Sequence, residues 1–159
     1  MSIAYVALGA NLGDPVNTIK SAIEMLKSLS NSRLVASSSL YRTAPMGLHN
    51  QPDFINAVVA LDTQLTPAAL LQQLFTVEAE FGRIRNVKNA PRTLDLDLLL
   101  HGHSVSNDPQ LTLPHPRMHR RAFVLAPLAE IAPEVSIPGY GAISDMLAAC
   151  VDQKVERLP

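Results

Sequence analysis

Two aspartates interrupt an otherwise apolar segment at residues 91–100, which reads PRTLDLDLLL. If this segment is a strand, Asp95 and Asp97 point from one face, about 6–7 Å apart, and the leucines between them point from the other. Two neighbouring carboxylates repel each other and are costly to bury without a cation. Divalent metal ions and arginines are the two candidate cations. The alternative is a half-exposed strand whose acids face solvent.

Two basic segments supply seven of the thirteen lysines and arginines of the chain. Residues 82–93, GRIRNVKNAPRT, contain four basic residues and no acid, and residues 114–121, PHPRMHRR, contain three arginines and two histidines. Arginine binds phosphate oxygens well, whereas carboxylates bind hard divalent cations. An acidic pair flanked by such segments therefore favours a site for a metal-bound polyphosphate.

The composition indicates one ordinary folded domain, residues 1–159. Hydrophobic residues make up 47% of the chain and charged residues 17%, which is typical of a globular protein. The net charge of −1 gives no general attraction to nucleic acid or to an anionic membrane. Because the positive charge is local, a small anionic ligand is the better partner.

The single cysteine and the lengths of the apolar segments exclude further classes of protein. The single cysteine, Cys150, excludes an intramolecular disulfide and a cysteine-based zinc site. We expect a cytoplasmic protein without a membrane partner, because no signal peptide and no apolar run approaching 18 residues is visible. His101 and His103 could bind a metal, but they lack a third ligand at the usual spacing, and we expect solvated turn histidines.

The elements that must position these residues follow from the apolar periodicity and the turn signals. Helices are predicted to begin at Pro15 and Pro67, after the N-caps Asp14 and Thr66. Gly9 and Gly13 are interpreted as turn glycines, since the Lys-Ser/Thr end of a phosphate loop is missing. Strands are predicted at residues 3–9, 33–42, 54–63 and 91–100, a third helix within 117–133, then a short helix and a closing strand at 155–158.

This order predicts an α+β fold with a ferredoxin-like βαββαβ core. We expect a mainly antiparallel sheet with helices packed on it, followed by a C-terminal extension. Residues 43–53, TAPMGLHNQPD, form either a ligand-binding loop or an ordinary surface connection. Asn56 lies among apolar residues, so its amide binds either backbone groups or the edge of a flat heterocycle.

The chain resembles the 6-hydroxymethyl-7,8-dihydropterin pyrophosphokinase family of folate biosynthesis. The matching motifs occur in one order between Ala4 and Glu134: GANLGDP, YRTAPMG, QPDFINAVV, EAEFGRIR, PRTLDLDLLL, LPHPRMHRRAFVLAPL and EIAPE. The resemblance implies that the hydroxymethyl oxygen of the pterin attacks the β-phosphorus of ATP and that AMP leaves. It implies two Mg²⁺ ions, with ATP and the pterin as the partners, and we expect a monomer.

The resemblance also assigns roles to residues of this chain. Asp95 and Asp97 would hold the Mg²⁺ ions, and Arg83 and Arg92 would join them in catalysis by reaching the triphosphate. The residues implied to bind ATP are Glu78, Arg85, Leu98, His115 and Arg121. The residues implied to bind the pterin are Thr43, Pro45, Met46, Phe54, Asn56 and Phe123.

The chain differs from the pattern of this family at several positions. NVKNA replaces a loop in which some members carry a tryptophan that closes over the pterin, and Phe75 and Gln110 replace polar or basic residues that some members use near the nucleotide. We expect residues 44–52 and 84–91 to be mobile without ligands.

Two alternatives remain beside this interpretation. One is a ferredoxin-like RNA-binding module, which seven Phe and Tyr, no Trp and a net negative charge disfavour. The other is a two-metal phosphodiesterase, which would hydrolyse ATP without the pterin.

Overall fold

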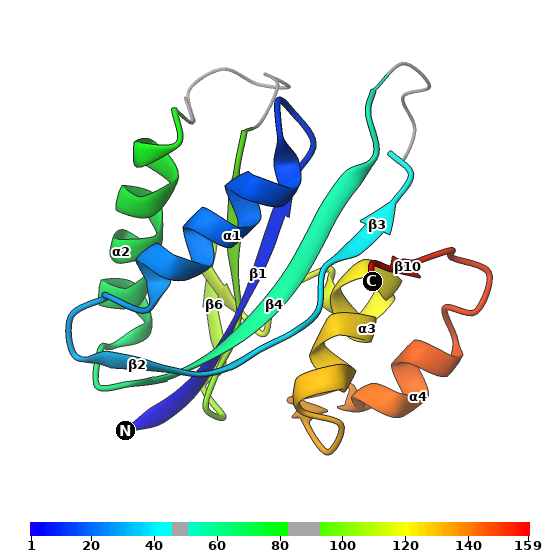
Figure 1. Cartoon of the computed structure of the whole chain (residues 1–159). Helices are drawn as coiled ribbons and strands as arrows, with labels where there is room; N and C mark the ends of the chain where they lie inside the picture. Colours follow the sequence, from blue (N-terminus) through cyan, green and yellow to red (C-terminus); the bar gives the residue numbers. More distant parts are fainter. Residues whose placement is uncertain (46–50, 83–92) are drawn as a thin grey trace.

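A central antiparallel sheet organises the protein (Figure 1). The computed structural model describes residues 1–45, 51–82 and 93–159. The sheet runs in the order β10-β3-β4-β1-β5, and β2 also pairs with β4. Its strands are β1 (Ser2–Ala10), β2 (Ser32–Ser37), β3 (Tyr41–Thr43), β4 (Phe54–Thr63), β5 (Asp95–His101) and β10 (Glu156–Arg157). The predicted α+β, ferredoxin-like arrangement is confirmed.

The helices lie on opposite sides of the central strands (Figure 1). The longer helices are α1 (Pro15–Leu26), α2 (Pro67–Glu80) and α3 (Ala122–Ile131). Both predicted N-caps are confirmed: the Asp14 side chain accepts from the Asn17 N–H, and the Thr66 side chain accepts from the Ala69 N–H. Gln153 supports the start of α3, since its side chain accepts from the Ala122 N–H.

The remaining elements extend the core. They are β6 (Ser106–Asp108), β7 (Leu111–Leu113), the 3₁₀ turn Met118–Arg120, β8 (Ser136–Ile137), β9 (Gly141–Ala142) and α4 (Ile143–Ala148). The short helix and the closing strand of the C-terminal extension were therefore predicted correctly. Cys150 is buried, but it lies just beyond the end of α4.

Two apolar cores cover the two faces of the sheet. Alternate residues of β1, from Ala4 to Ala10, are buried with α1 and α2. The intervening Tyr5 and Ala7 pack in the second core with α3. This alternation is the expected consequence of a two-residue strand period. Among the described residues, no helix is long and apolar enough to cross a membrane.

The prediction of one strand at residues 33–42 was wrong. The strand is broken into β2 and β3 around Ser38, whose hydroxyl accepts from the Val58 N–H at 2.9 Å. A side-chain oxygen here takes the place of a backbone carbonyl, which is a common way for serine to interrupt a regular ladder.

Candidate active site

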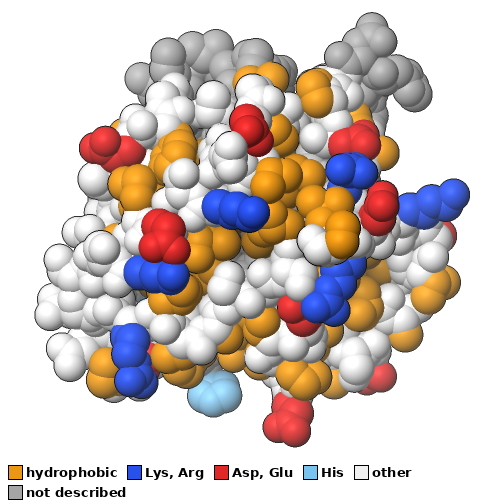
Figure 2. All heavy atoms as spheres, in the orientation of Figure 1, with side chains coloured by type: hydrophobic (Ala, Val, Ile, Leu, Met, Phe, Trp, Pro, Cys, Tyr) orange, Lys and Arg blue, Asp and Glu red, His pale blue; other side chains and the backbone are white. Residues whose placement is uncertain are grey.

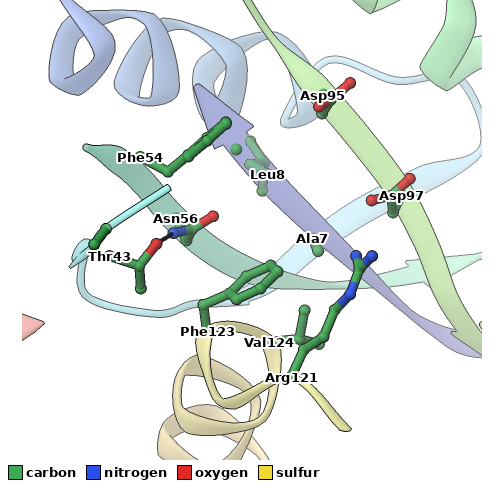
Figure 3. Close-up of a pocket in the computed structure, with 12 residues that line it drawn as sticks. Ala7, Leu8, Thr43, Phe54, Asn56, Asp95, Asp97, Arg121, Phe123 and Val124 are labelled. Carbon is green, nitrogen blue, oxygen red and sulfur yellow. Dashed lines mark hydrogen bonds between the residues drawn. The ribbon is translucent and has the colours of Figure 1, made fainter. Parts of the chain in front are cut away.

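The two aspartates of β5 share one face of the strand, as predicted. Leu94, Leu96 and Leu98 are buried in the core beneath α1 and α2. Asp95 and Asp97 point away from that core and line a cavity of about 330 Å³ (Figure 3). Their carboxylates are thus open to a ligand, while the leucines anchor the strand that carries them.

The register of the sheet places an amide and a carboxylate on either side of a glycine. Gly9 of β1 is paired with Asn56 of β4 and with Asp95 of β5. Neighbouring strands lie about 4.8 Å apart, so the backbones of Asn56 and Asp95 are about 10 Å apart. The interpretation of Gly9 as a turn residue was wrong, because it lies inside β1. Gly13, at a φ of 64°, is in a bend and fits that interpretation.

One end of this cavity combines aromatic rings with a fixed amide. Phe54 and Phe123 line it from β4 and α3, with Thr43 and Asn56 between them (Figure 3). The Asn56 Nδ2 donates to the Thr43 Oγ1 at 2.9 Å, and this bond is buried. The bond sets the orientation of the amide. This end therefore suits a flat ring with polar edges.

The other end of the cavity is charged. Arg121 precedes α3 and directs its guanidinium toward Asp97 (Figure 3). Burial is the main cause that lowers the pKa of Arg121; Arg117 and Arg120 lower it further, whereas Asp97 and Asp95 raise it. The Arg121 Cζ also lies 5.4 Å from the centre of the Phe123 ring. A cation is therefore held between the aspartates and the aromatic end.

A second cavity, of about 210 Å³, adjoins the first at Asp97, which lines both. Leu98 and His115 line it, together with Leu71, Phe75, Gln110 and Thr112. The pKa of His115 is lowered, mainly by burial. The charge of Asp97 raises this pKa, whereas the charges of Arg121 and Arg117 lower it further. The two cavities thus share one electrostatic environment around Asp97.

Two predicted site residues have other surroundings. Glu78 is buried in α2, and its carboxylate accepts from the Leu96 N–H at 2.8 Å, next to the aspartates. Pro45 is half-buried but is not among the residues that line the first cavity, where Ala44 lies instead. Met46, Arg83, Arg85 and Arg92 lie outside the described residues, as do most of the two segments that we expect to be mobile.

The donor set fits a hard cation that shares its coordination with a ligand. Within residues 1–45, 51–82 and 93–159, no group of three or more His, Cys, Asp or Glu side chains could hold a metal. Mg²⁺ is commonly held by one or two carboxylates plus waters and substrate phosphates. Asp95 and Asp97 match that pattern.

His101 and His103 differ in their surroundings. His101 is 5% exposed, and its Nε2 lies 2.9 Å from the Leu65 carbonyl oxygen. The expectation that this histidine is solvated was wrong, because β5 extends through it into the core. His103 is exposed.

The sequence reasoning missed several residues that line the cavities. Ala7 and Gly9 form the floor of the first cavity, and Leu71 and Thr112 line the second. The two residues of β1 could have been found from strand alternation, since they share the face of Tyr5. The lining of the second cavity depends on how α2 and the β6–β7 hairpin pack against each other. The apolar periodicity of the sequence does not predict this packing.

Comparisons with known proteins agree with one another. The family model described as 7,8-dihydro-6-hydroxymethylpterin-pyrophosphokinase (HPPK) matches residues 5–133. Two relatives are named 2-amino-4-hydroxy-6-hydroxymethyldihydropteridine pyrophosphokinase. The one from Pseudomonas aeruginosa is 47% identical, covering 98% of this chain and 96% of its own. The one from Haemophilus influenzae is 42% identical, covering 99% of both chains.

A solved structure shares the fold. The crystal structure of a Plasmodium falciparum HPPK-DHPS triple mutant has a TM-score of 0.78 and 15% sequence identity. The match covers 95% of this chain and 44% of that longer one, so this chain spans less than half of it. At this identity the likeness concerns the fold alone.

Proposed function

Since this chain belongs to the 7,8-dihydro-6-hydroxymethylpterin-pyrophosphokinase family, we propose that it transfers the terminal diphosphoryl group of ATP to 6-hydroxymethyl-7,8-dihydropterin. It is a pyrophosphokinase of folate biosynthesis. The main support for transfer between these two substrates is that two cavities meet at Asp97. An acceptor in the first and a nucleotide in the second would direct their reacting groups at the same carboxylates.

The aromatic end of the first cavity is the proposed pterin site. Phe54 and Phe123 offer apolar faces to a bicyclic ring, and Asn56 offers both a donor and an acceptor to its polar edge. Thr43 holds that amide in place. Pro45 and Met46, which follow β3 in the sequence, would complete the proposed site.

The second cavity is the proposed nucleotide site. His115 and Leu98 line it, and Arg121 lies near both aspartates in the neighbouring cavity. Arg83, Arg85 and Arg92 would add positive charge to the phosphates. Glu78 acts in this proposal through Leu96, because its buried carboxylate fixes the backbone of the strand between the two aspartates.

The reaction forms a bond between the hydroxymethyl oxygen and the β-phosphorus. It breaks the bond between the β-phosphorus and the oxygen that bridges to the α-phosphorus, so that AMP leaves with the bridging oxygen and the hydroxyl proton is released. Mg²⁺ held by Asp95 and Asp97 would neutralise the phosphate charge and orient the triphosphate. Arg121 stabilises the charge that develops on the transferred group. The cavity walls hold the acceptor in line, since positioning accounts for much of catalysis in phosphoryl transfer.

The proposal is tested by identifying the nucleotide product. With ATP, Mg²⁺ and the hydroxymethyl dihydropterin, we expect AMP in amounts equal to the pterin diphosphate formed. We expect no turnover when Mg²⁺ is removed by a chelator or when the pterin is omitted. AMP or ADP formation that does not depend on the pterin would instead support a nucleotide hydrolase.

An RNA-binding role has little support from the fold. Part of the face of the sheet that such modules use for stacking is covered by α3, and α1 and α2 cover the other face. On the face shown in Figure 2, lysines and arginines lie dispersed among acidic and neutral residues. Tight, salt-dependent binding of single-stranded RNA would be needed to revive this alternative.

Gly9→Ala tests the floor of the proposed pterin site. A Cβ at this position would lie 3.2 Å from the Asn56 Oδ1, and it would extend into the cavity. We expect the Kd for the pterin to rise about tenfold. The new methyl group would shift the Asn56 amide and weaken one hydrogen bond to the pterin, at a cost of about 1.4 kcal/mol, which corresponds to a factor of ten. Equilibrium titration measures it. The Kd for an ATP analogue and the Tm should stay unchanged, and an unchanged pterin Kd would contradict the assignment of the floor.

A further inference from the structure

One carboxylate outside the cavities joins the two elements that form the walls of the proposed pterin site. Glu130 lies in the last turn of α3. Its side chain accepts hydrogen bonds from Tyr41 in β3 and from Ser39, two residues before that strand. The Tyr41 hydroxyl donates to the Glu130 Oε1 at 2.6 Å. The Ser39 N–H lies 3.0 Å from each carboxylate oxygen, and the Ser39 hydroxyl donates to Oε2 at 3.1 Å.

The position of this carboxylate is unfavourable without such partners. A negative charge in the last turn of a helix opposes the helix dipole. Burial would raise the pKa of Glu130, but hydrogen bonds from Tyr41 and Ser39 and the charge of Arg157 lower it overall. Burial and the Glu130 carboxylate raise the pKa of Tyr41 to about 12. At neutral pH the pair is therefore a phenol donor and a carboxylate acceptor.

The geometry of α3 connects this contact to the cavity. Phe123 and Glu130 are seven residues apart, which is close to two helical turns, so they share one side of the helix about 10 Å apart. On β3, Tyr41 and Thr43 are two residues apart and share one face of the strand. Each wall of the site thus carries one residue in the cavity and one residue in the contact.

The turn that carries Phe123 depends on outside support. Pro127 lies inside α3 and has no N–H to donate to the carbonyl of Phe123, four residues earlier. Gln153 holds the start of the helix through the Ala122 N–H, and Glu130 holds its end. Contacts at the two ends of α3 therefore act together with its buried face, Val124, Leu125 and Leu128, in setting the distance between the Phe123 ring and the Thr43–Asn56 pair.

We infer that Glu130 is a positioning residue that sets the width of the pterin site by holding α3 against β3. This inference rests on the proposed function. It predicts that loosening the contact weakens pterin binding through Phe123, without affecting the nucleotide cavity, which α3 does not line.

The test compares Glu130→Gln and Tyr41→Phe with Glu134→Gln, an exposed glutamate three residues beyond α3. Titrations with the hydroxymethyl dihydropterin and with an ATP analogue are made well below the Tm of each variant. We expect the pterin Kd to rise about tenfold in Glu130→Gln, which removes the charge that strengthens every contact from Tyr41, Ser39 and Arg157. We expect a rise of about threefold in Tyr41→Phe, which removes only one of these hydrogen bonds. The ATP-analogue Kd should change in neither, and Glu134→Gln should match the wild type.

A double-mutant cycle with Phe123→Ala separates positioning from general loss of stability. If Glu130 acts through the Phe123 ring, its replacement should change the pterin Kd less than about twofold once the ring is absent. Equal effects in both backgrounds, or unchanged pterin binding in both Glu130→Gln and Tyr41→Phe, overturn the inference. If Glu130→Gln does not fold, the Tyr41→Phe cycle decides alone. A wild-type protein that fails to bind the pterin refutes the proposed function instead.

Discussion

Replacing Asp97 by Ala should lower kcat by about 10³-fold or more, which corresponds to about 4 kcal/mol of barrier. Asp97 lines both cavities and faces Arg121 (Figure 3), so it would meet both proposed substrates. Its loss removes a proposed metal ligand and one of the two negative charges that act on Arg121. Steady-state AMP formation at saturating ATP and pterin measures the effect.

Matched variants show whether this loss is specific. Asp95→Ala should behave like Asp97→Ala, because both side chains lie on the same face of β5. Asp152→Asn, at an exposed position, should retain full activity. Circular dichroism should show an unchanged fold in all three. Wild-type kcat in either Asp→Ala variant would rule out the proposed metal ligands.

Replacing Asn56 by Ala should lower kcat/KM for the pterin by about 100-fold. The amide is 6% exposed and is oriented by Thr43, so its remaining groups are ready to bind a polar ring edge. A site built to hydrogen-bond a substrate loses about 1–3 kcal/mol when one such group is removed. Kinetics with varied pterin at saturating ATP give the value.

Two comparisons separate recognition from folding at this position. Thr43→Val keeps the size of the side chain but removes the acceptor for the Asn56 Nδ2, and we expect about a tenfold loss of kcat/KM. Asn107→Ala, in the exposed β6, should have no effect. The KM for ATP should stay constant throughout. An increase in the KM for ATP as large as that for the pterin would argue against a pterin-specific role of Asn56.

Much of the fold could be predicted because local patterns determined it. The aspartates of β5 were assigned to the correct face because leucines alternate with them along a buried strand. Both helix starts were found because Asp14 and Thr66 precede prolines, and a capping side chain acts within three residues. The ferredoxin-like order then followed from the sequence of elements.

The errors have physical causes that act over long distances. Ser38 breaks a strand through its bonds with Val58. Gly9 has the sequence neighbourhood of a turn, but pairing with both neighbouring strands keeps it extended. The partners of Glu130 are 89 and 91 positions away, so no periodicity could indicate its role. The regular two-residue alternation of β5 also fails at Leu99 and Leu100, where a bulge shifts the register and both side chains enter one core.

The central claim is that a diphosphoryl group moves as one unit to the pterin. ATP labelled separately at the β- and γ-phosphorus tests this claim most directly, when the products are separated after reaction with the hydroxymethyl dihydropterin and Mg²⁺. We predict that both labels appear in the pterin product, in equal amounts, and that unlabelled AMP is released. Transfer of the γ-label alone, with the β-label remaining in ADP, would contradict the account.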